Sequence, residues 1–537
     1  MRKEHLSTRR SRRRVPGQKP RGCFQDRVKK VGPEHFAIIP VDCGKPEART
    51  RVADFYGNVL LEPFSFDVSK SGLQTAVSRI AKTLKKHHIH DCVCVIESTG
   101  RYHRPIKEAF QAQHWDTREV HPFTTAMIRR SADLGTKTDD IDLAAEHRAA
   151  VDGLAMRPEV LDIPSQEWRL LTRHRRDFVE KAATLKVQLK EIIDAYLPGY
   201  TRLWKGDDFW ASPVPLTIAT TFDTPQAVRD AAPEAFRQAT RDVGSLIHKE
   251  TIDRIRAWSH NAAPPDHGHQ MNFRRAVSLR NDLHAKQQEI ARLELDLAVF
   301  LAHSPCLLLL AFPGIHVVSA SDYGAELGPI TNYANSKSIA GRAGLYPSRY
   351  QTSHTDYPDG PLVARRNRQL RAALMRLARN LGRSNHYFMS LANAYETRHD
   401  KNDPKVVIAR AFSRLSYYLI AGEKLFPHAA IHNGDKILQK LLDFHLERKA
   451  SPQQVTQVLN HAIARLAGPA LRAERDALDA QHRELLQKTR RTQAIQSLGE
   501  ILPQVLLRIH QRLQEEPNDN GNTTLQNFST EDVTHGS

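Results

Sequence analysis

Two short apolar runs that each end in an acid constrain this chain more than any other feature. Ile38-Ile39-Pro40-Val41 leads into Asp42, and Val93-Cys94-Val95-Ile96 leads into Glu97. Continuous apolar runs of this length are typical of strands buried on both faces. A carboxylate at the end of such a strand is costly to bury unless a cation or hydrogen-bond donors face it. The two runs therefore predict buried strands whose ends carry acids with a chemical or structural task.

A third acidic motif, Lys-Thr-Asp-Asp-Ile-Asp, occupies residues 137–142. On a helix Asp139 and Asp142 share one face, whereas Asp140 points about 100° away. Oxygen-only clusters suit Mg²⁺ or Mn²⁺, and paired ions of this kind activate the attacking oxygen and stabilise the leaving oxygen of a phosphodiester. Taken singly, Asp42 could cap a turn, Glu97 could accept from backbone donors and Asp139 could be a helix N-cap. The joint pattern favours a metal site.

The surrounding residues predict one compact α/β domain over residues 35–160. Short apolar runs and turn residues predict strands at 36–42, 51–56, 59–66, 91–97 and 117–121, with a hairpin turn at Gly57-Asn58. Helical spacing predicts helices at 73–86, 104–113, 124–131 and 140–151. Strands mixed with helices in this order indicate a single sheet covered by helices.

Heptad spacing predicts two long helices within residues 161–305. Apolar residues recur at this spacing in both, at Leu171, Phe178, Leu185 and Ile192 and again at Leu279, Leu283, Ile290, Leu293, Leu297 and Phe300. The helices flank an insert that contains Trp204 and Trp210. Such a pair is typical of a dimerising coiled coil, and equally of an intramolecular helical hairpin.

Residues 306–430 predict a second globular unit, followed by a helical extension at 431–514 and a disordered polar tail at 515–537. Within the second unit, Leu370, Leu374, Leu377 and Leu381 form one apolar helical stripe. The opposite face carries only basic charge, and its residues are Arg365, Arg368, Arg376, Arg379 and Arg383. Guanidinium groups match phosphate oxygens, so this face predicts nucleic-acid binding, with a merely solvated face as the alternative.

Charge points to the same partner. Lys and Arg number 78 against 60 Asp and Glu, a net charge of +18. Residues 1–34 are expected to be a disordered basic arm that neutralises phosphates without reading sequence, or a solvated tail. No run approaches the roughly 18 apolar residues of a membrane span, so we expect a soluble, cytoplasmic, nucleoid-associated protein with no membrane contact. Five scattered cysteines without CxxC spacing predict neither disulfides nor zinc.

In this order the motifs resemble the DEDD transposases of insertion sequence family 110, which are understood as RNA-guided recombinases. Val41 to Lys45 is similar to their D-x-[SG]-K, residues 96–102 to E-x-T-G-x-Y, and residues 137–142 to K-T-D-x-x-D. The resemblance implies a RuvC-like, RNase H-type domain with Asp42, Glu97, Asp139 and Asp142 as its quartet of ligands for Mg²⁺ or Mn²⁺. The expected architecture is α/β plus α, namely this domain, a long helical or coiled-coil arm and a mainly helical transposase domain.

The second half resembles the same family through residues 311–315 and 343–353. The family supplies a nucleophilic serine after its G-L-x-P segment, which implies Ser353, although His354 stands where a glycine is usual. Thr352 and Ser348 are the alternatives. His316 stands where the family turn P-G-I-G ends in glycine, and a histidine there would be strained if its φ were positive.

The resemblance further implies composite sites in a homodimer or homotetramer, and a structured bridge RNA that pairs with donor and target DNA. The predicted function is therefore a transposase that cuts and rejoins DNA with the acid quartet and a serine. Two other functions stay open. A RuvC-type junction-resolving nuclease needs the acids alone, and a non-catalytic nucleic-acid-binding protein needs neither acids nor serine.

Overall fold

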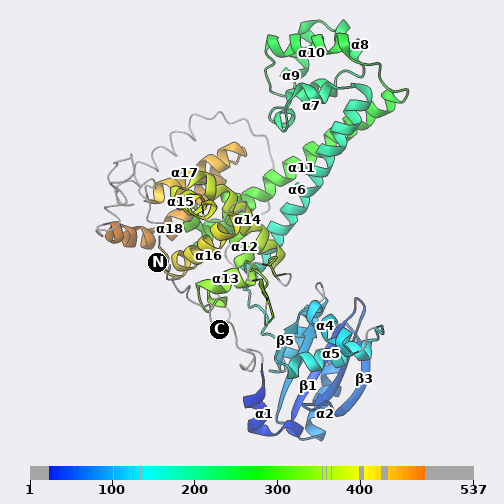
Figure 1. Ribbon diagram of the computed structural model, residues 1–537, viewed down its shortest axis with the longest axis vertical. Helices are drawn as coiled ribbons and strands as arrows, with labels where there is room; N and C mark the ends of the chain where they lie inside the picture. The colour runs from blue at the N-terminus through cyan, green and yellow to red at the C-terminus, as the bar shows by residue number, and fades with distance from the viewer. Residues whose placement is uncertain are drawn as a thin grey trace. The chain divides into compact units, whose positions relative to one another are not determined.

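The computed structural model describes residues 23–98, 100, 102–132, 135–352, 355–357, 360–363, 366–397, 404–424 and 433–477. The chain divides after Val160 into two compact units (Figure 1). The first contains the sheet, and the second is mainly helical. The expected boundary between the α/β domain and the arm lies at the same place.

The first unit is built on a five-stranded mixed sheet. Its strands are β1 (Phe36–Cys43), β2 (Glu47–Asp54), β3 (Val59–Asp67), β4 (Asp91–Glu97) and β5 (Asp116–Val120), in the order β3-β2-β1-β4-β5. β1 pairs antiparallel with β2 and parallel with β4. The Asp54 carboxylate accepts from the backbone of Gly57 and Asn58, which closes the predicted hairpin turn. This is the RNase H-like α/β architecture that the sequence predicts.

Helices cover both faces of this sheet. α2 (Lys70–Lys86) and α3 (His103–Gln111) pack on one face through a core that includes Ile80 and Phe110. On the other face lie α1 (Gln25–Val31), α4 (Pro122–Ala132) and α5 (Asp139–Val151), which contribute apolar residues such as Ala149 to a second core. Three layers result, with β1 and β4 buried between helices.

Helix α1 corrects the expected extent of the basic arm, which was placed at residues 1–34. Val28 is buried in the core beside α5, and Arg27 Nε donates to Asp91 at 2.8 Å. Arg27 also pairs with Asp116. These partners lie 64 and 89 residues away in the chain, so local composition does not reveal them. Residues 1–22, which hold most of the arm's charge, lie outside the described residues.

The arm is an intramolecular pair of long helices, α6 (Ile163–Tyr196) and α11 (His269–His303), running side by side (Figure 1). Trp168 stacks on Phe300 at one end, and Tyr196 meets Phe273 at the other, so the two helices are antiparallel. The far end carries α7 (Val214–Ala219), α8 (Pro225–Asp230), α9 (Pro233–Arg241) and α10 (Lys249–Asn261), with a core that they share with the adjoining parts of α6 and α11. The predicted helices are confirmed, and each finds its heptad partner within the chain.

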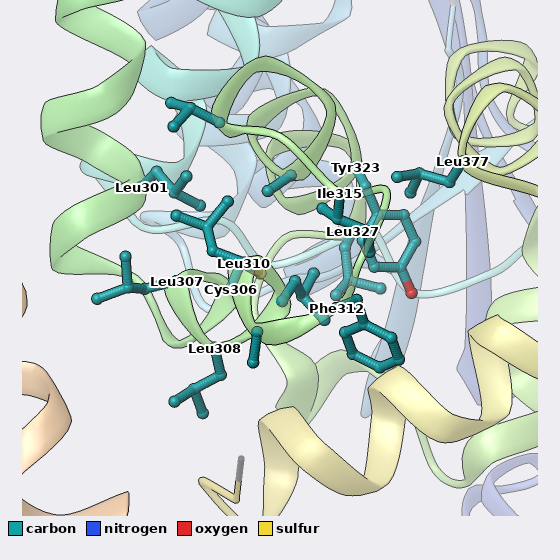
Figure 2. Close-up of a cluster of buried hydrophobic side chains, with 14 of the residues drawn as sticks. Leu301, Cys306, Leu307, Leu308, Leu310, Phe312, Ile315, Tyr323, Leu327 and Leu377 are labelled. Atoms are coloured by element: carbon teal, nitrogen blue, oxygen red, sulfur yellow. The ribbon is translucent and has the colours of Figure 1, made fainter. Parts of the chain in front are cut away.

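The rest of the second unit is a helical body around one large core. Its elements are the 3₁₀ helix η4 (Pro305–Ala311), α12 (Val317–Leu327), α13 (Ser336–Arg342), the hairpin β6 (Tyr350–Gln351) and β7 (Asp356–Tyr357), α14 (Arg368–Ser384), α15 (His386–Glu396), α16 (Lys405–Ala421), α17 (Asn433–Glu447) and α18 (Pro452–Ala477). Figure 2 shows side chains of η4, α12 and α14 converging there, among them Leu310, Tyr323 and Leu377. Residues of α17 and α18 join the same core.

Ion pairs fasten the arm to the body. Arg173 on α6 bonds to Glu326 of α12 at 2.7 Å, and Arg176 on the same helix bonds to Asp322 of α12 at 3.2 Å. Within the described residues no single helix is long and apolar enough to cross a membrane. α11 and η4 satisfy that criterion only together, across a bend of 103°, and the apolar residues of η4 and of the last turns of α11 lie in the body's core.

Candidate active site

Asp42 and Glu97 lie at matching ends of neighbouring parallel strands. Val41 of β1 is in register with Ile96 of β4, so the two acids follow paired residues directly. Side chains alternate between the faces of a strand. Phe36 and Ile38, and likewise Val93 and Val95, belong to the core beside α5, which places both acids on the α5 face of the sheet.

Helix α5 brings the other two acids to that face. Asp139 and Asp142 lie in its first turn, Asp142 nearly buried and Asp139 exposed. Thr138 caps the helix, because its hydroxyl accepts from the Ile141 amide at 3.3 Å, so the alternative role of Asp139 as N-cap is wrong. Asp140 is exposed and bonds to Arg49 at 2.9 Å instead. The expected separation of Asp140 from the pair is thereby observed.

Three of the four carboxylates are near enough for their charges to act on the fourth, Asp42. Burial raises the pKa of Asp42, and the charges of Asp142, Glu97 and Asp139 raise it further, in that order. The site at the ends of β1 and β4 therefore concentrates negative charge with Asp42 at its centre. A divalent cation would relieve that repulsion.

Two cations on neighbouring segments offset part of this charge. Arg129 of α4 pairs with Oδ1 of Asp142, and Lys137 Nζ lies 4.0 Å from Oδ2 of the same residue. Within the described part of the chain, no three Asp, Glu, His or Cys side chains are arranged so that they could hold a metal ion. The donors are nevertheless all carboxylates, the ligands that Mg²⁺ and Mn²⁺ prefer, so the quartet fits such an ion in kind.

The second motif surrounds the hairpin of β6 and β7. Ser353, the expected nucleophile, lies outside the described residues. Thr352 is exposed and its amide donates to the Thr355 carbonyl at 2.7 Å, and Ser348 is also exposed. Arg371 supports the preceding segment by donating to the carbonyls of Ala343, Gly344 and Val363. The choice among the three hydroxyls stays a prediction.

The arginine face of α14 divides into two groups. Leu370, Leu374, Leu377 and Leu381 are fully buried, as their stripe predicts. Arg368, Arg379 and Arg383 are exposed, and no carboxylate of the described residues pairs with them. Arg376, by contrast, donates to Asp322 of α12 at 2.9 Å. Arg365 lies outside the described residues.

The turn before α12 differs from the expectation of strain. His316 has φ −113°, an extended conformation open to any residue, and its backbone amide donates to the Ser319 hydroxyl at 2.9 Å at the start of α12. Gly314 is the residue with positive φ, +86°, and a Cβ there would lie 3.0 Å from the Asn380 carbonyl oxygen of α14. Lys440 of α17 donates to the carbonyls of Leu310, Phe312 and Ile315 and holds this turn from outside the motif.

Two residues of the acidic site were missed by the sequence analysis, Arg129 and Glu146. Arg129 belongs to another helix and no local pattern marks it. Glu146 lies one helical turn beyond Asp142 and seven residues beyond Asp139, so it falls on the same helix face. That spacing was the available signal.

Comparison with known proteins matches both parts of the chain. A family model described as a transposase, of the DEDD and IS110 type, matches residues 39–198 and contains all four acids. A second, described as the transposase IS116/IS110/IS902 family, matches residues 306–392. A curated relative, the "Insertion element IS116 uncharacterized 44.8 kDa protein" of Streptomyces clavuligerus, is 25% identical over 222 residues, 39% of this chain and 53% of the relative. The chain thus spans about half the length of that relative. With the DEDD domain followed by the second transposase domain, the chain belongs to the IS110 family of transposases.

Proposed function

We propose that this protein is a DNA transposase that cuts and rejoins strands through a carboxylate-bound Mg²⁺ or Mn²⁺ and a serine nucleophile. The observation that carries the proposal is the gathering of Asp42, Glu97, Asp139 and Asp142 on one face of an RNase H-like sheet. Four acids whose charges raise the pKa of the central one are a poor arrangement for folding alone. They are a suitable arrangement for a divalent cation.

In this mechanism the quartet positions the cation. Asp42 and Glu97 are fixed by the sheet, and Asp139 and Asp142 by the first turn of α5. A divalent ion bound there supplies positive charge that favours deprotonation of an attacking hydroxyl and offsets charge on the scissile phosphate. Arg129 neutralises Asp142 and so limits the repulsion among the acids until the ion binds.

Ser353 is the proposed nucleophile. Its hydroxyl oxygen forms a bond to phosphorus while the bond from phosphorus to the leaving deoxyribose oxygen breaks. The serine gives its proton to a base, and the leaving deoxyribose oxygen takes up a proton. The phosphoserine bond retains the energy of the cleaved diester, so the reverse attack by a strand end reseals DNA without ATP. A serine is a weak nucleophile unless a base or metal assists it.

The proposed partners follow from the family and from charge. Donor and target DNA are the substrates, and a structured bridge RNA selects them by pairing, within a homodimer or homotetramer whose sites combine residues of two protomers. Delegating sequence choice to RNA leaves the protein to bind backbones. The exposed side chains of Arg368, Arg379 and Arg383 provide fork-shaped donors for phosphate oxygens.

A covalent-trapping assay tests the proposal. The full-length protein is incubated with Mg²⁺, the candidate RNA and end-labelled DNA carrying element junctions, then denatured and separated on a gel. Ser353→Ala, Thr352→Ala and Ser348→Ala are compared with the parent. We expect a protein–DNA adduct that disappears only with Ser353→Ala, and that Asp42→Asn also abolishes.

The other outcomes separate the alternatives. Loss of the adduct with Thr352→Ala or Ser348→Ala alone would move the nucleophile to that residue. Cleavage without any adduct, abolished by Asp42→Asn and retained by Ser353→Ala, would contradict the transposase mechanism and indicate a junction-resolving nuclease. Tight binding without cleavage, unchanged by Asp42→Asn, would indicate a binding protein.

A further inference from the structure

Glu146 on α5 occupies the space between the acid quartet and the apolar core. Helix residues four apart lie on the same face, so Asp142, Glu146 and Ala150 follow one line along α5. Ala150 is part of the core against the sheet, and Asp142 is part of the quartet. Glu146 therefore lies directly inward of Asp142, on the side of the helix that faces β1.

The carboxyl group of Glu146 is isolated there. The residue is 0% exposed, and neither carboxylate oxygen has a hydrogen-bond partner. The Val41 backbone on β1 lies close enough to favour its charged form, but no donor reaches hydrogen-bond geometry. Arg51 of β2 is near enough for the charge of Glu146 to act on it, yet the two side chains form no ion pair.

The neighbours of Glu146 are the predicted metal ligands. After burial, the charges of Asp42 and Glu97 are what raise its pKa most, and that of Asp142 contributes as well. Glu146 is thus close to three members of the quartet. A buried acid with neither hydrogen bond nor counter-ion costs stability, and an apolar residue of the same size would fill this space more favourably. Packing alone gives no reason for a carboxyl group at this position.

We propose that Glu146 is a fifth carboxylate of the cation site, facing from the core side the ion held by Asp42, Glu97, Asp139 and Asp142. A divalent cation supplies the partner that the protein itself leaves out. The inference rests on the proposed function, because it takes the quartet to be a metal site. It adds a residue on the buried side of that site, where a longer side chain, Glu rather than Asp, is needed to reach the strand ends from one turn further along α5.

Mn²⁺ binding to the full-length protein tests the inference without any DNA reaction. Isothermal titration calorimetry with MnCl₂ is performed on the parent, Glu146→Gln and Glu146→Leu. We expect both variants to bind Mn²⁺ about 10- to 100-fold more weakly, the range seen when groups that support a metal site are removed. Their melting temperatures in EDTA should equal or exceed that of the parent, which shows that the fold is intact. The Leu variant provides the answer if the Gln variant does not fold.

Two further variants make the result interpretable. Asp140→Asn removes an acid from the same helix that is exposed and paired with Arg49, and it should leave Mn²⁺ affinity unchanged. Asp142→Asn should abolish tight binding. Parent-like Mn²⁺ affinity of both Glu146 variants, with loss in Asp142→Asn, would overturn the role of Glu146 and leave the proposed function standing. Parent-like affinity in Asp142→Asn as well would contradict the metal site itself.

Discussion

The arginines on one face of α14 differ in what we expect them to do. Arg379 and Arg383 should bind DNA phosphates, whereas Arg376 should stabilise the fold through its ion pair. Replacing Arg379 and Arg383 together by Gln should lower the salt dependence of DNA binding, because both side chains are exposed and free of carboxylate partners among the described residues. Each lost phosphate contact on duplex DNA reduces the slope of log K against log salt by about 0.9, so the double variant should lose about 1.8. Arg376→Gln should leave the slope unchanged.

Arg376→Gln should instead lower the free energy of unfolding. The Arg376 side chain is 47% exposed and that of Asp322 is 7% exposed, so the pair lies between an exposed and a buried ion pair. Asp322 keeps Arg176 at 3.2 Å after the change. We expect Arg376→Gln to lower the free energy of unfolding by about 1–2 kcal/mol. This is more than the loss of an exposed ion pair costs, and less than the loss of the sole partner of a buried charge.

Both effects can be measured on the same proteins. Fluorescence anisotropy of a labelled duplex over a KCl series gives the slopes, and urea denaturation gives stability. Arg237→Gln, on the arm and paired with Glu234, makes the same change in charge and serves as the control. The reasoning is refuted if Arg376→Gln lowers the slope by about 0.9 while the double variant at Arg379 and Arg383 does not.

Three further predictions concern other parts of the chain. Lys440→Met should lower the free energy of unfolding at pH 7, measured by urea denaturation, by about 3 kcal/mol. Three carbonyls lose their donor at roughly 1–3 kcal/mol each, and removing the buried charge offsets part of that loss. Burial lowers the pKa of Lys440 from 10.5 to about 8, so the stability of the parent, but not of this variant, should gain a contribution as pH rises from 8 to 10.5. Deleting residues 1–22 should lower the salt slope of DNA binding at constant melting temperature, whereas deleting residues 1–30 should also lower the melting temperature because Arg27 and its ion pairs are lost. Asp42→Asn should raise the melting temperature in EDTA at pH 7, because the folded-state pKa of Asp42 is raised and its charge therefore opposes folding above that pKa; an unchanged or lower value would contradict this.

The sequence predicts the elements of the first unit well because their signals are local. The apolar runs of β1 and β4 and the turn at Gly57-Asn58 appear where the pattern places them. Periodicity also identifies the buried stripe of α14 and both long helices of the arm. Periodicity does not show what the apolar face of a helix packs against. The heptad spacing therefore left open whether α6 and α11 pack against each other or against a second chain.

What the sequence does not reveal are mainly the partners of its side chains. Arg376 shares a helix face with Arg379, but only Arg376 forms an ion pair with Asp322, which lies 54 residues from it in the sequence. Local composition assigns Arg27 to a basic arm, whereas in the fold it forms ion pairs with acids on β4 and β5. The strain expected at His316 was assigned by analogy of position, whereas backbone conformation in the turn assigns positive φ to Gly314. For Arg376 and Arg27 a contact distant in sequence is what local composition does not reveal, and for His316 it is the conformation of the turn.

The acidic site itself is asymmetric in how its charge is balanced. On the solvent side Asp142 has Arg129 and Lys137 as cationic partners, and Asp140 has Arg49. On the core side Glu146 is fully buried and has no hydrogen-bond partner on either carboxylate oxygen. In the proposed mechanism Asp142 Oδ1 would serve as a ligand for a divalent ion only after Arg129 had released it, because the two groups are paired in this structure. A released Arg129 guanidinium would be available to donate to a DNA phosphate, so on the proposed mechanism cation binding and substrate binding should favour one another through Arg129.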